Sequence, residues 1–346
     1  MRSIHPAHSA RALCLRVLGG VSLVALIATA QAQPTLAPLP PSPDAPDYVP
    51  VPLTAAAPSS SNTQRVPMSA FDPLVTPATQ RLLPGKIVFS MLVTPDLTKA
   101  ENFYGPLFGW SFRPVNGGKH PRVEIMQAGR AIGTMVAHPL DNPKQDVPFW
   151  LPFISTSDTA TVARVTKRYG GHVLFGPRKW DGLGQAVIVS DPQQGIYAAL
   201  SAQSGDPEDL STAPMLDSFS WATLLTPSPS TAAGYYQMLF NYQVTAAPEA
   251  DSGAHYILSS QGQERASVNT LPPDVMPRDK ARWIQFVQVR NSATTATRAV
   301  SLGGQVIVPT HVDRDGALIS VIADPTGAVF GLIEAQRDML EMGPAQ

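Results

Sequence analysis

Residues that could bind a metal ion or attack a substrate are sparse in this chain of 346 residues. Its single cysteine is Cys14, and neither a Gly-x-Ser-x-Gly nucleophile motif nor a His-Glu-x-x-His zinc motif occurs. Beyond residue 32 the histidines are His120, His138, His172, His255 and His311. Because these lie far apart in the sequence, any metal site or catalytic group has to be assembled by the fold.

The charge balance argues against one class of partner. The chain has 25 Lys and Arg residues against 26 Asp and Glu residues, which gives a formal net charge of -1. A protein that neutralises nucleic-acid phosphates normally carries a basic excess. We therefore expect no nucleic-acid partner.

The N-terminus has the pattern of a secretory signal peptide. Arg2, Arg11 and Arg16 form a basic start, residues 17–30 are uncharged and mostly apolar, and Ala30-Gln31-Ala32 is an A-x-A cleavage site. The apolar run is shorter than the roughly 20 residues that a membrane span needs. We expect residues 1–32 to be removed, which leaves a secreted or periplasmic protein with no membrane span and no cysteine.

Residues 33–85 have the composition of a disordered linker. Between positions 33 and 84 there are 13 prolines, with Ala, Ser and Thr filling most of the remaining positions. Such a segment buries too little apolar surface to fold alone. It is expected to act as a spacer before the folded part of the chain.

Beyond Lys86 the sequence repeats itself at long range. Residues 92–96 and 100–110 return at 224–228 and 232–242, an offset of 132, and the segment around Gly170-Gly171 returns at Gly303-Gly304, an offset of 133. Two unrelated markers with nearly the same offset indicate an internal duplication. The pattern predicts folded halves at residues 86–203 and 216–336, a linker at 204–215 and a C-terminal tail at 337–346.

A shorter unit recurs within each half. Each unit has an apolar strand-like run followed by a residue suited to capping a helix N-terminus, and these residues are Asp96, Asp158, Ser228 and Asn291. A helical pattern and further short strands come next. The sequence therefore predicts an α+β fold built from four β-α-β-β-β modules.

These residues resemble the vicinal oxygen chelate superfamily, which includes glyoxalase I, bleomycin-resistance proteins and extradiol dioxygenases. Residues 89–96 with 103–110 look like the family's opening strand and helix, and residues 191–197 and 324–330 look like its closing turn and last strand. The resemblance covers residues 86 to 336. It implies that modules pair so that their sheets form two cups around ligands.

The resemblance also implies where a metalloenzyme of this family would hold a divalent cation. The first-strand ligand lies seven residues before each helix-opening residue, which gives Phe89, Leu151, Trp221 and Ile284, and the closing-strand acid would fall at Ala198 and Gly331. None of these six side chains can bind a metal. We expect no metal, no other cofactor and no catalytic residue.

Three other residues would have to act as displaced ligands if the chain were an enzyme. His138 follows a strand-like run, Glu124 lies in a strand of undefined facing, and Glu334 is out of phase with the closing-strand position. His172 and His311 are interpreted as solvated residues.

The residues at the vacant positions predict apolar cups. Within each first strand, two residues share one face; these candidate ligand-binding residues are Phe89, Met91, Leu151, Phe153, Trp221, Thr223, Ile284 and Phe286. Faces of this composition suit a small apolar or aromatic ligand. The alternative is that the same side chains fill the cups completely.

The leading hypothesis is an exported protein that binds a small apolar or aromatic molecule or acts as a scaffold. One alternative is a metal-dependent lyase or dioxygenase of the same superfamily with displaced ligands, and another is a structural module of the envelope with filled cups. A monomer is plausible because the duplication can replace dimerisation, although a homodimer stays open.

The signal sequence predicts a mature chain that begins at Gln33. Expression of the full chain in a bacterium should therefore give protein in the periplasm or medium whose N-terminal sequence starts there. Protein that stays in the cytoplasm and begins at Met1 would contradict export.

Overall fold

The computed structural model describes residues 70–116, 119–139, 147–209, 215–247, 253–273, 275 and 279–335. The predicted signal peptide, the predicted linker up to residue 69 and the predicted C-terminal tail lie outside these residues. Among the described residues, no helix has both the length and the hydropathy that crossing a membrane requires.

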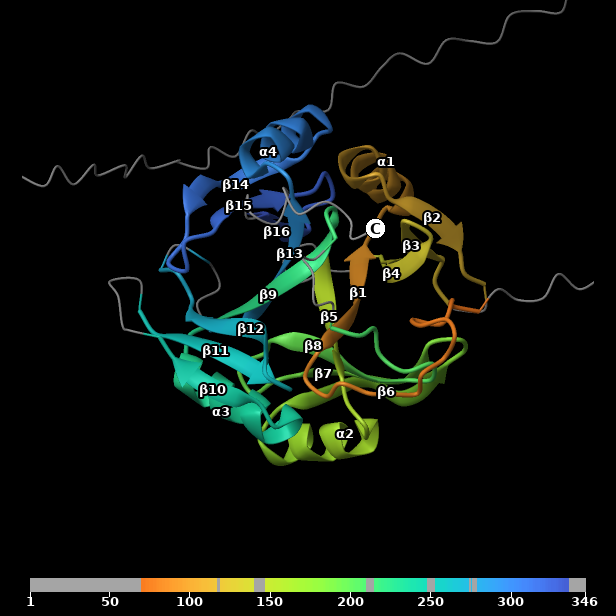
Figure 1. Ribbon diagram of the computed structural model, residues 1–346, viewed down its shortest axis with the longest axis vertical. Coiled ribbons are helices and arrows are strands. Elements are labelled where there is room, and N and C mark those ends of the chain that lie inside the picture. Colours follow the sequence, from red (N-terminus) through yellow and green to blue (C-terminus); the bar gives the residue numbers. More distant parts are fainter. Residues whose placement is uncertain are drawn as a thin grey trace, which may run out of the picture. The chain divides into compact units, whose positions relative to one another are not determined.

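The predicted four-module α+β fold is confirmed (Figure 1). Module 1 contains β1 (Ile87–Thr94), α1 (Leu97–Phe108), β2 (Ser111–Pro114), β3 (Arg122–Gln127) and β4 (Arg130–Ala137). Module 2 contains β5 (Phe149–Ser155), α2 (Thr159–Arg168), β6 (His172–Trp180), β7 (Gly184–Ser190) and β8 (Ile196–Ala202). Module 3 contains β9 (Ser218–Thr226), α3 (Pro229–Phe240), β10 (Gln243–Ala246), β11 (His255–Ser260) and β12 (Gln263–Thr270). Module 4 contains β13 (Arg282–Val289), α4 (Ser292–Ser301), β14 (Gln305–Val312), β15 (Leu318–Ala323) and β16 (Val329–Glu334).

The helices begin where the capping residues predict. The side chains of Asp96, Asp158 and Asn291 accept hydrogen bonds from first-turn backbone N–H groups, which otherwise lack partners. Ser228 makes no such bond, and Pro229 at the first helical position sets the helix start instead. Gly109 ends α1 in the left-handed conformation with φ of 70°.

The modules pair within each half to form two mixed eight-stranded sheets. The first has the order β2-β3-β4-β1-β5-β8-β7-β6, and the second repeats it as β10-β11-β12-β9-β13-β16-β15-β14. In each sheet the opening strands of two modules lie antiparallel at the centre, β1 with β5 and β9 with β13. The two halves predicted from the duplication therefore each form one sheet.

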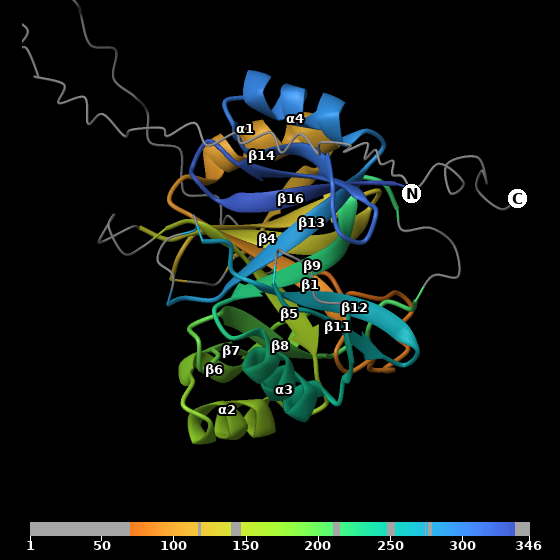
Figure 2. The same cartoon turned by 90° about the vertical axis from the view of Figure 1, so that its left-hand side faces the viewer.

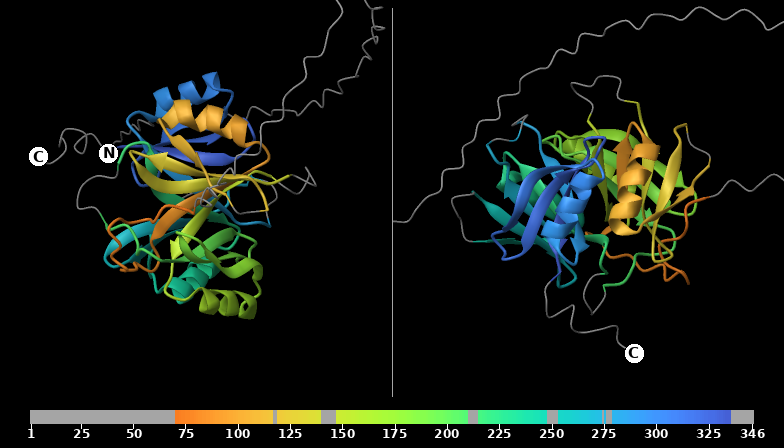
Figure 3. Two further views of the ribbon diagram at one scale, coloured as in Figure 1. Left: turned by 90° about the vertical axis from the view of Figure 1, so that its right-hand side faces the viewer. Right: turned by 90° about the horizontal axis from the view of Figure 1, so that it is seen from above.

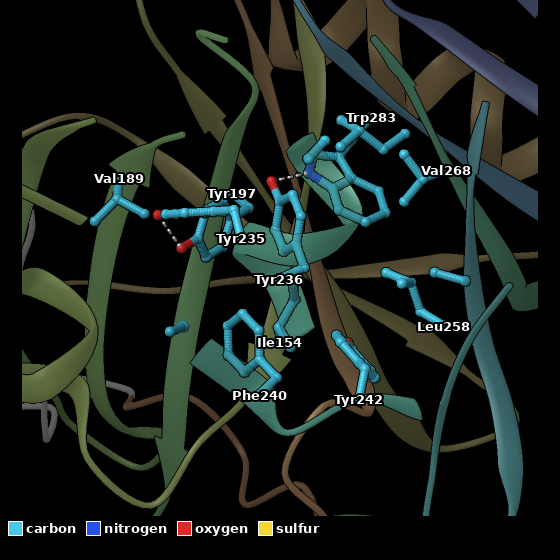
Figure 4. Close-up of a cluster of buried hydrophobic side chains, with 14 of the residues drawn as sticks. Ile154, Val189, Tyr197, Tyr235, Tyr236, Phe240, Tyr242, Leu258, Val268 and Trp283 are labelled. Carbon is cyan, nitrogen blue, oxygen red and sulfur yellow. Dashed lines mark hydrogen bonds between the residues drawn. The ribbon is translucent and has the colours of Figure 1, made fainter. Parts of the chain in front are cut away.

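The hydrophobic cores, in contrast, cross between the halves. α1 and α4 lie side by side, and so do α2 and α3 (Figures 1, 2 and 3). One core joins residues of modules 1 and 4, such as Tyr104 and Phe330, and another joins residues of modules 2 and 3, such as Tyr197 and Phe240 (Figure 4). The helix-covered faces of the sheets are therefore buried against one another, and only the opposite faces are free to line a cavity.

Two chains of buried hydrogen bonds also connect the two halves of the protein. The Trp150 indole N–H donates to the Tyr104 hydroxyl at 2.9 Å, and that hydroxyl donates to Asp324 Oδ2 at 3.0 Å. The second chain is its repeat. Trp283 Nε1 donates to the Tyr236 hydroxyl at 3.0 Å (Figure 4), and that hydroxyl donates to Asp191 Oδ2 at 3.0 Å. Each chain ties three modules together.

Residues 70–85 differ from the expectation of a disordered linker, because they pack against the first sheet. Phe71 and Leu74 are buried in a core with Phe89 and Phe153, and the Phe71 backbone N–H donates to the carbonyl of Asp181 at 3.0 Å. At Gly182, with φ of 86°, a Cβ would lie 1.8 Å from the Phe71 carbonyl oxygen, so this close approach requires glycine. We call residues 70–83 the arm.

The segment after the first half is also fixed in part. Asp206 Oδ2 accepts a hydrogen bond from the Leu83 backbone N–H at 2.6 Å, and Asp209 pairs with Lys86 and Arg265. Hydrogen bonds from Arg265 and Lys86 hold the pKa of Asp209 at about 2. Residues 204–209 of the predicted linker therefore hold the end of the arm against both halves.

The burial of Phe71 predicts that the arm stabilises the folded protein. Phe71→Ala should lower the free energy of unfolding by roughly 3 kcal/mol, because it removes a buried ring and leaves a cavity. Urea denaturation of the mature chain measures this change. Phe175→Ala is the control, because Phe175 is 39% exposed, and should cost less than about 1 kcal/mol. Equal losses for the two variants would contradict the packed arm.

Candidate functional site

One continuous hollow of about 2760 Å³ is lined by the faces of the two sheets opposite the helices. Pockets for one small molecule usually measure about 300–1,000 Å³. The hollow is therefore larger than a single ligand requires, and its two ends differ in structure. We call the face that carries Met91 and Leu151 cup 1, and the face that carries Thr223 and Ile284 cup 2.

The eight residues predicted to bind ligand lie in facing pairs on the central strands. In cup 1, Phe89 pairs with Phe153 and Met91 with Leu151. In cup 2, Trp221 pairs with Phe286 and Thr223 with Ile284. Six of the eight line the hollow: Met91, Leu151, Trp221, Thr223, Ile284 and Phe286. Phe89 and Phe153 do not line it, because they lie in the core beneath the arm.

Aromatic side chains fill the inner part of cup 1. The rings of Phe89 and Phe153 meet edge to face with centroids 5.5 Å apart. The ring of Phe71 from the arm lies 6.1 Å from Phe89 and stacks on Trp180 at 5.7 Å. The family resemblance places a first-strand metal ligand at Phe89, and packed rings occupy that region instead.

Cup 2 has no corresponding plug among the described residues, and its two sides differ in polarity. On one side, Thr223 Oγ1 lies 2.9 Å from Ser267 Oγ, and the Trp221 indole N–H donates to the same Ser267 oxygen at 3.4 Å. The neighbouring strands add an apolar wall formed by Leu225, Ile257, Ile284, Phe286, Ile319, Val321, Val329 and Ile333. Cup 2 therefore offers a broad apolar surface beside a short strip of hydrogen-bonding groups.

The strand registers identify the closing-strand positions that the sequence left incomplete. Ala198 pairs with Phe153 in module 2, and Gly331 with Phe286 in module 4. The equivalent partners in modules 1 and 3 are Thr134, opposite Met91, and Ser267, opposite Thr223. The sequence contained a signal for both, because Thr134 and Ser267 are 133 residues apart, like the other repeated positions.

The residues at these positions do not fit a divalent metal. Each cup has one hydroxyl, Thr134 or Ser267, and three side chains without a metal-binding atom. The Thr134 hydroxyl already donates to the Val123 carbonyl at 2.7 Å. At Gly331, a Cβ would lie 2.1 Å from Phe286 Cδ1, so a carboxylate there would displace the phenyl ring. In the described parts of the chain, no three His, Cys, Asp or Glu side chains come together as a ligand set.

The three residues considered as displaced ligands lie apart and have structural partners. His138 Nδ1 is 2.8 Å from the Pro139 oxygen, and its ring stacks on His120. Glu334 accepts a hydrogen bond from the Ser292 backbone N–H at 2.9 Å, at the start of α4.

Glu124 is fully buried and binds the arm. It accepts hydrogen bonds from the Asp72 backbone N–H at 2.9 Å and from Arg113 Nε at 3.1 Å. Burial raises the pKa of Glu124, and the bonds from Arg113 and Asp72 act in the opposite direction. Glu124 therefore anchors the arm and is not placed to hold a metal.

The remaining histidines do not form a site with one another. His172 and His311 line the hollow. His255 is buried in β11, where its Nδ1 lies 2.5 Å from Asn269 Oδ1 and its Nε2 lies 3.5 Å from the exposed Asp315 carboxylate.

Comparisons with known proteins agree with this fold. The family model described as "Glyoxalase-like domain" matches residues 221–333. The chain is 26% identical over 248 residues to a Mycobacterium tuberculosis protein named "Putative glyoxylase CFP32", covering 70% of this chain and 92% of the relative. It is 25% identical over 268 residues to the anthracycline biosynthesis protein DauV of a Streptomyces species, covering 73% of this chain and 94% of that one.

Solved structures share the same architecture. The Mn(II)-bound glyoxalase of Novosphingobium aromaticivorans superposes with a TM-score of 0.50 at 13% identity, covering 73% of this chain and 82% of that chain. The 2,3-dioxygenase LapB of Pseudomonas sp. KL28 has the same TM-score and identity, covering 74% and 93%. At this identity the likeness concerns the fold alone.

Proposed function

This chain belongs to the vicinal oxygen chelate superfamily, and we propose that it is an exported binding protein whose cup 2 holds a small, planar, largely apolar molecule. The observation that carries the proposal is the open apolar wall of cup 2 beside the Thr223–Ser267 hydroxyl pair. Large aromatic surfaces supply affinity, and a few fixed polar groups orient the ligand. The proposal needs no metal, because binding a planar molecule requires only this surface.

Trp221 is the residue that we expect to contribute most to ligand affinity in cup 2. It is partly exposed, it lines the hollow, and its indole N–H is held toward Ser267. Phe286 lies opposite it across the strand pair, and Gly331 leaves room for the Phe286 ring to lie over the backbone. Two fixed aromatic groups can contact a planar ligand with little loss of side-chain entropy.

The relatives support this ligand class. DauV is named for anthracycline biosynthesis, and an anthracycline contains a planar fused-ring system. A flat aromatic body with oxygen substituents matches an apolar wall bordered by hydroxyl groups. We propose that the protein binds a ligand of this class and does not use a metal ion to convert it. We also propose that the exported protein is a monomer or a homodimer.

A neutral fluorescent probe tests the binding site in cup 2. N-phenyl-1-naphthylamine should bind the mature chain, and Trp221→Ala should raise its dissociation constant about tenfold, because a stacking surface is lost. Tyr169→Ala is the control, because Tyr169 is an exposed aromatic residue at the end of α2. Its affinity should equal that of the unmodified chain.

Circular dichroism would confirm that both variants fold. Unchanged affinity of a folded Trp221→Ala variant would overturn the placement of the ligand in cup 2. Absence of any saturable binding to the unmodified chain would favour the scaffold hypothesis.

A further inference from the structure

The open part of cup 1 is lined by more basic than acidic side chains, unlike the chain as a whole. The basic side chains that line this end of the hollow are Lys119, Arg122, Arg178 and Lys179, and the acidic ones are Asp181 and Asp191. Asp191 is 1% exposed and already accepts a hydrogen bond from Tyr236. In contrast, the end at cup 2 has three basic and three acidic lining residues: Lys280, Arg282, Arg314, Glu264, Asp313 and Asp315. Cup 1 therefore has a basic mouth in a chain whose net charge is close to zero.

Arg122 is partly buried, whereas the other three basic residues of this mouth are exposed. Strand β3 places it beside Val136 of β4, and its guanidinium carbon lies 6.0 Å from the centroid of the Trp180 ring. Its Nε is buried and has no hydrogen-bond partner within the described part of the chain. Burial also lowers the pKa of Arg122, although an arginine side chain stays protonated in proteins.

Two other arginines that are partly or fully buried, Arg113 and Arg265, show what such a group can hold. Arg113 pairs with Glu124 and Asp72, and Arg265 pairs with Asp209 through both guanidinium NH groups. No ion pair of Arg122 with a described carboxylate is present within 4 Å. A half-buried donor without a partner is costly, and a carboxylate or sulfonate would offset that cost through charge-assisted hydrogen bonds.

Next to this basic mouth, the surface of cup 1 is apolar. The residues that line the hollow there are Met91, Val93, Val136, Phe149, Leu151, Trp180, Ile188 and Ile196. Because the arm fills the inner part of cup 1, this outer part is the volume that a ligand can reach. Its composition suits a ring system that contacts these apolar side chains with its acidic group toward the guanidinium.

We propose that the outer part of cup 1 is a second binding site, which takes a small aromatic anion whose acidic group is held by Arg122. This site differs from cup 2 in its residues and in the charge of its ligand. The two proposed sites use different residues, so an experiment that disproves one site does not disprove the other.

Two probes that differ by one acidic group test this site. 8-Anilinonaphthalene-1-sulfonate is N-phenyl-1-naphthylamine with an added sulfonate. Arg122→Gln should raise the dissociation constant of the sulfonate about tenfold and weaken its dependence on salt, because one fixed charge is lost. The same variant should leave the affinity for the neutral probe unchanged. Trp221→Ala should leave the affinity for the sulfonate unchanged.

Arg168→Gln is the matched control, because Arg168 is an exposed arginine in the last turn of α2. Its sulfonate affinity should equal that of the unmodified chain. Equal sulfonate affinity in Arg122→Gln and Arg168→Gln would overturn the proposal.

A competition experiment on the unmodified mature chain does not depend on the folding of any variant. 1-Naphthoate should displace the bound sulfonate at a concentration about tenfold lower than 1-naphthalenemethanol, a neutral molecule of nearly the same size. Equal displacement by the two competitors would show that charge is not recognised and would overturn the proposal.

Discussion

The two buried Trp–Tyr–Asp hydrogen-bond chains are the interaction on which the rest of the molecule depends. In each, a tyrosine hydroxyl on a helix accepts from an indole N–H and donates to an aspartate in the turn before a closing strand, as in Trp150, Tyr104 and Asp324. Asp324 Oδ1 also accepts from the backbone N–H groups of Thr326 and Ala328, so one carboxylate shapes the turn and joins two halves of the chain. Removing one member would leave buried polar groups without partners, which is costly in a low-dielectric core.

This crossing determines where ligands can bind. Since the helix-covered faces of both sheets are buried in the two shared cores, the opposite faces are left to line the hollow. The two halves nevertheless differ. Cup 1 is covered in part by the arm and has a basic mouth around Arg122, while cup 2 has an open apolar wall with a hydroxyl strip. In both cups, residues without metal-binding atoms, such as Phe89 and Gly331, stand at the positions where the family resemblance would place the ligands of a cation.

Much of the fold was predictable because its signals are local. The four capping positions, from Asp96 to Asn291, and the offset of 132 to 133 residues were enough to predict four modules, and the family resemblance implied their pairing into two cups. The shared cores were not, because nothing in the sequence of α1 specifies that it packs beside α4. The arm was missed for a related reason. Its composition is that of a disordered segment, and its order comes from long-range partners such as Asp181, Glu124 and Asp206.

The candidate site was predictable only in part. Strand alternation identified residues that share a face, including Trp221 and Thr223, and the family resemblance implied that these faces line the cups. It could not predict that Phe89 would be covered by Phe71. Arg122 gave no signal either, because its significance lies in having no carboxylate partner among the residues that the structure describes, which is a property of the fold.

The metal content of the mature protein tests most directly whether both cups lack a metal site. The chain from Gln33 would be purified without tag or chelator, incubated with manganese, iron, nickel and zinc salts, passed through a desalting column and analysed by inductively coupled plasma mass spectrometry. We predict far less than one ion of any metal per chain, before and after incubation, because the side chains in the cups provide no ligand set. A stable ratio near one ion per chain would contradict this account and would return His138, Glu124 and Glu334 to consideration as ligands.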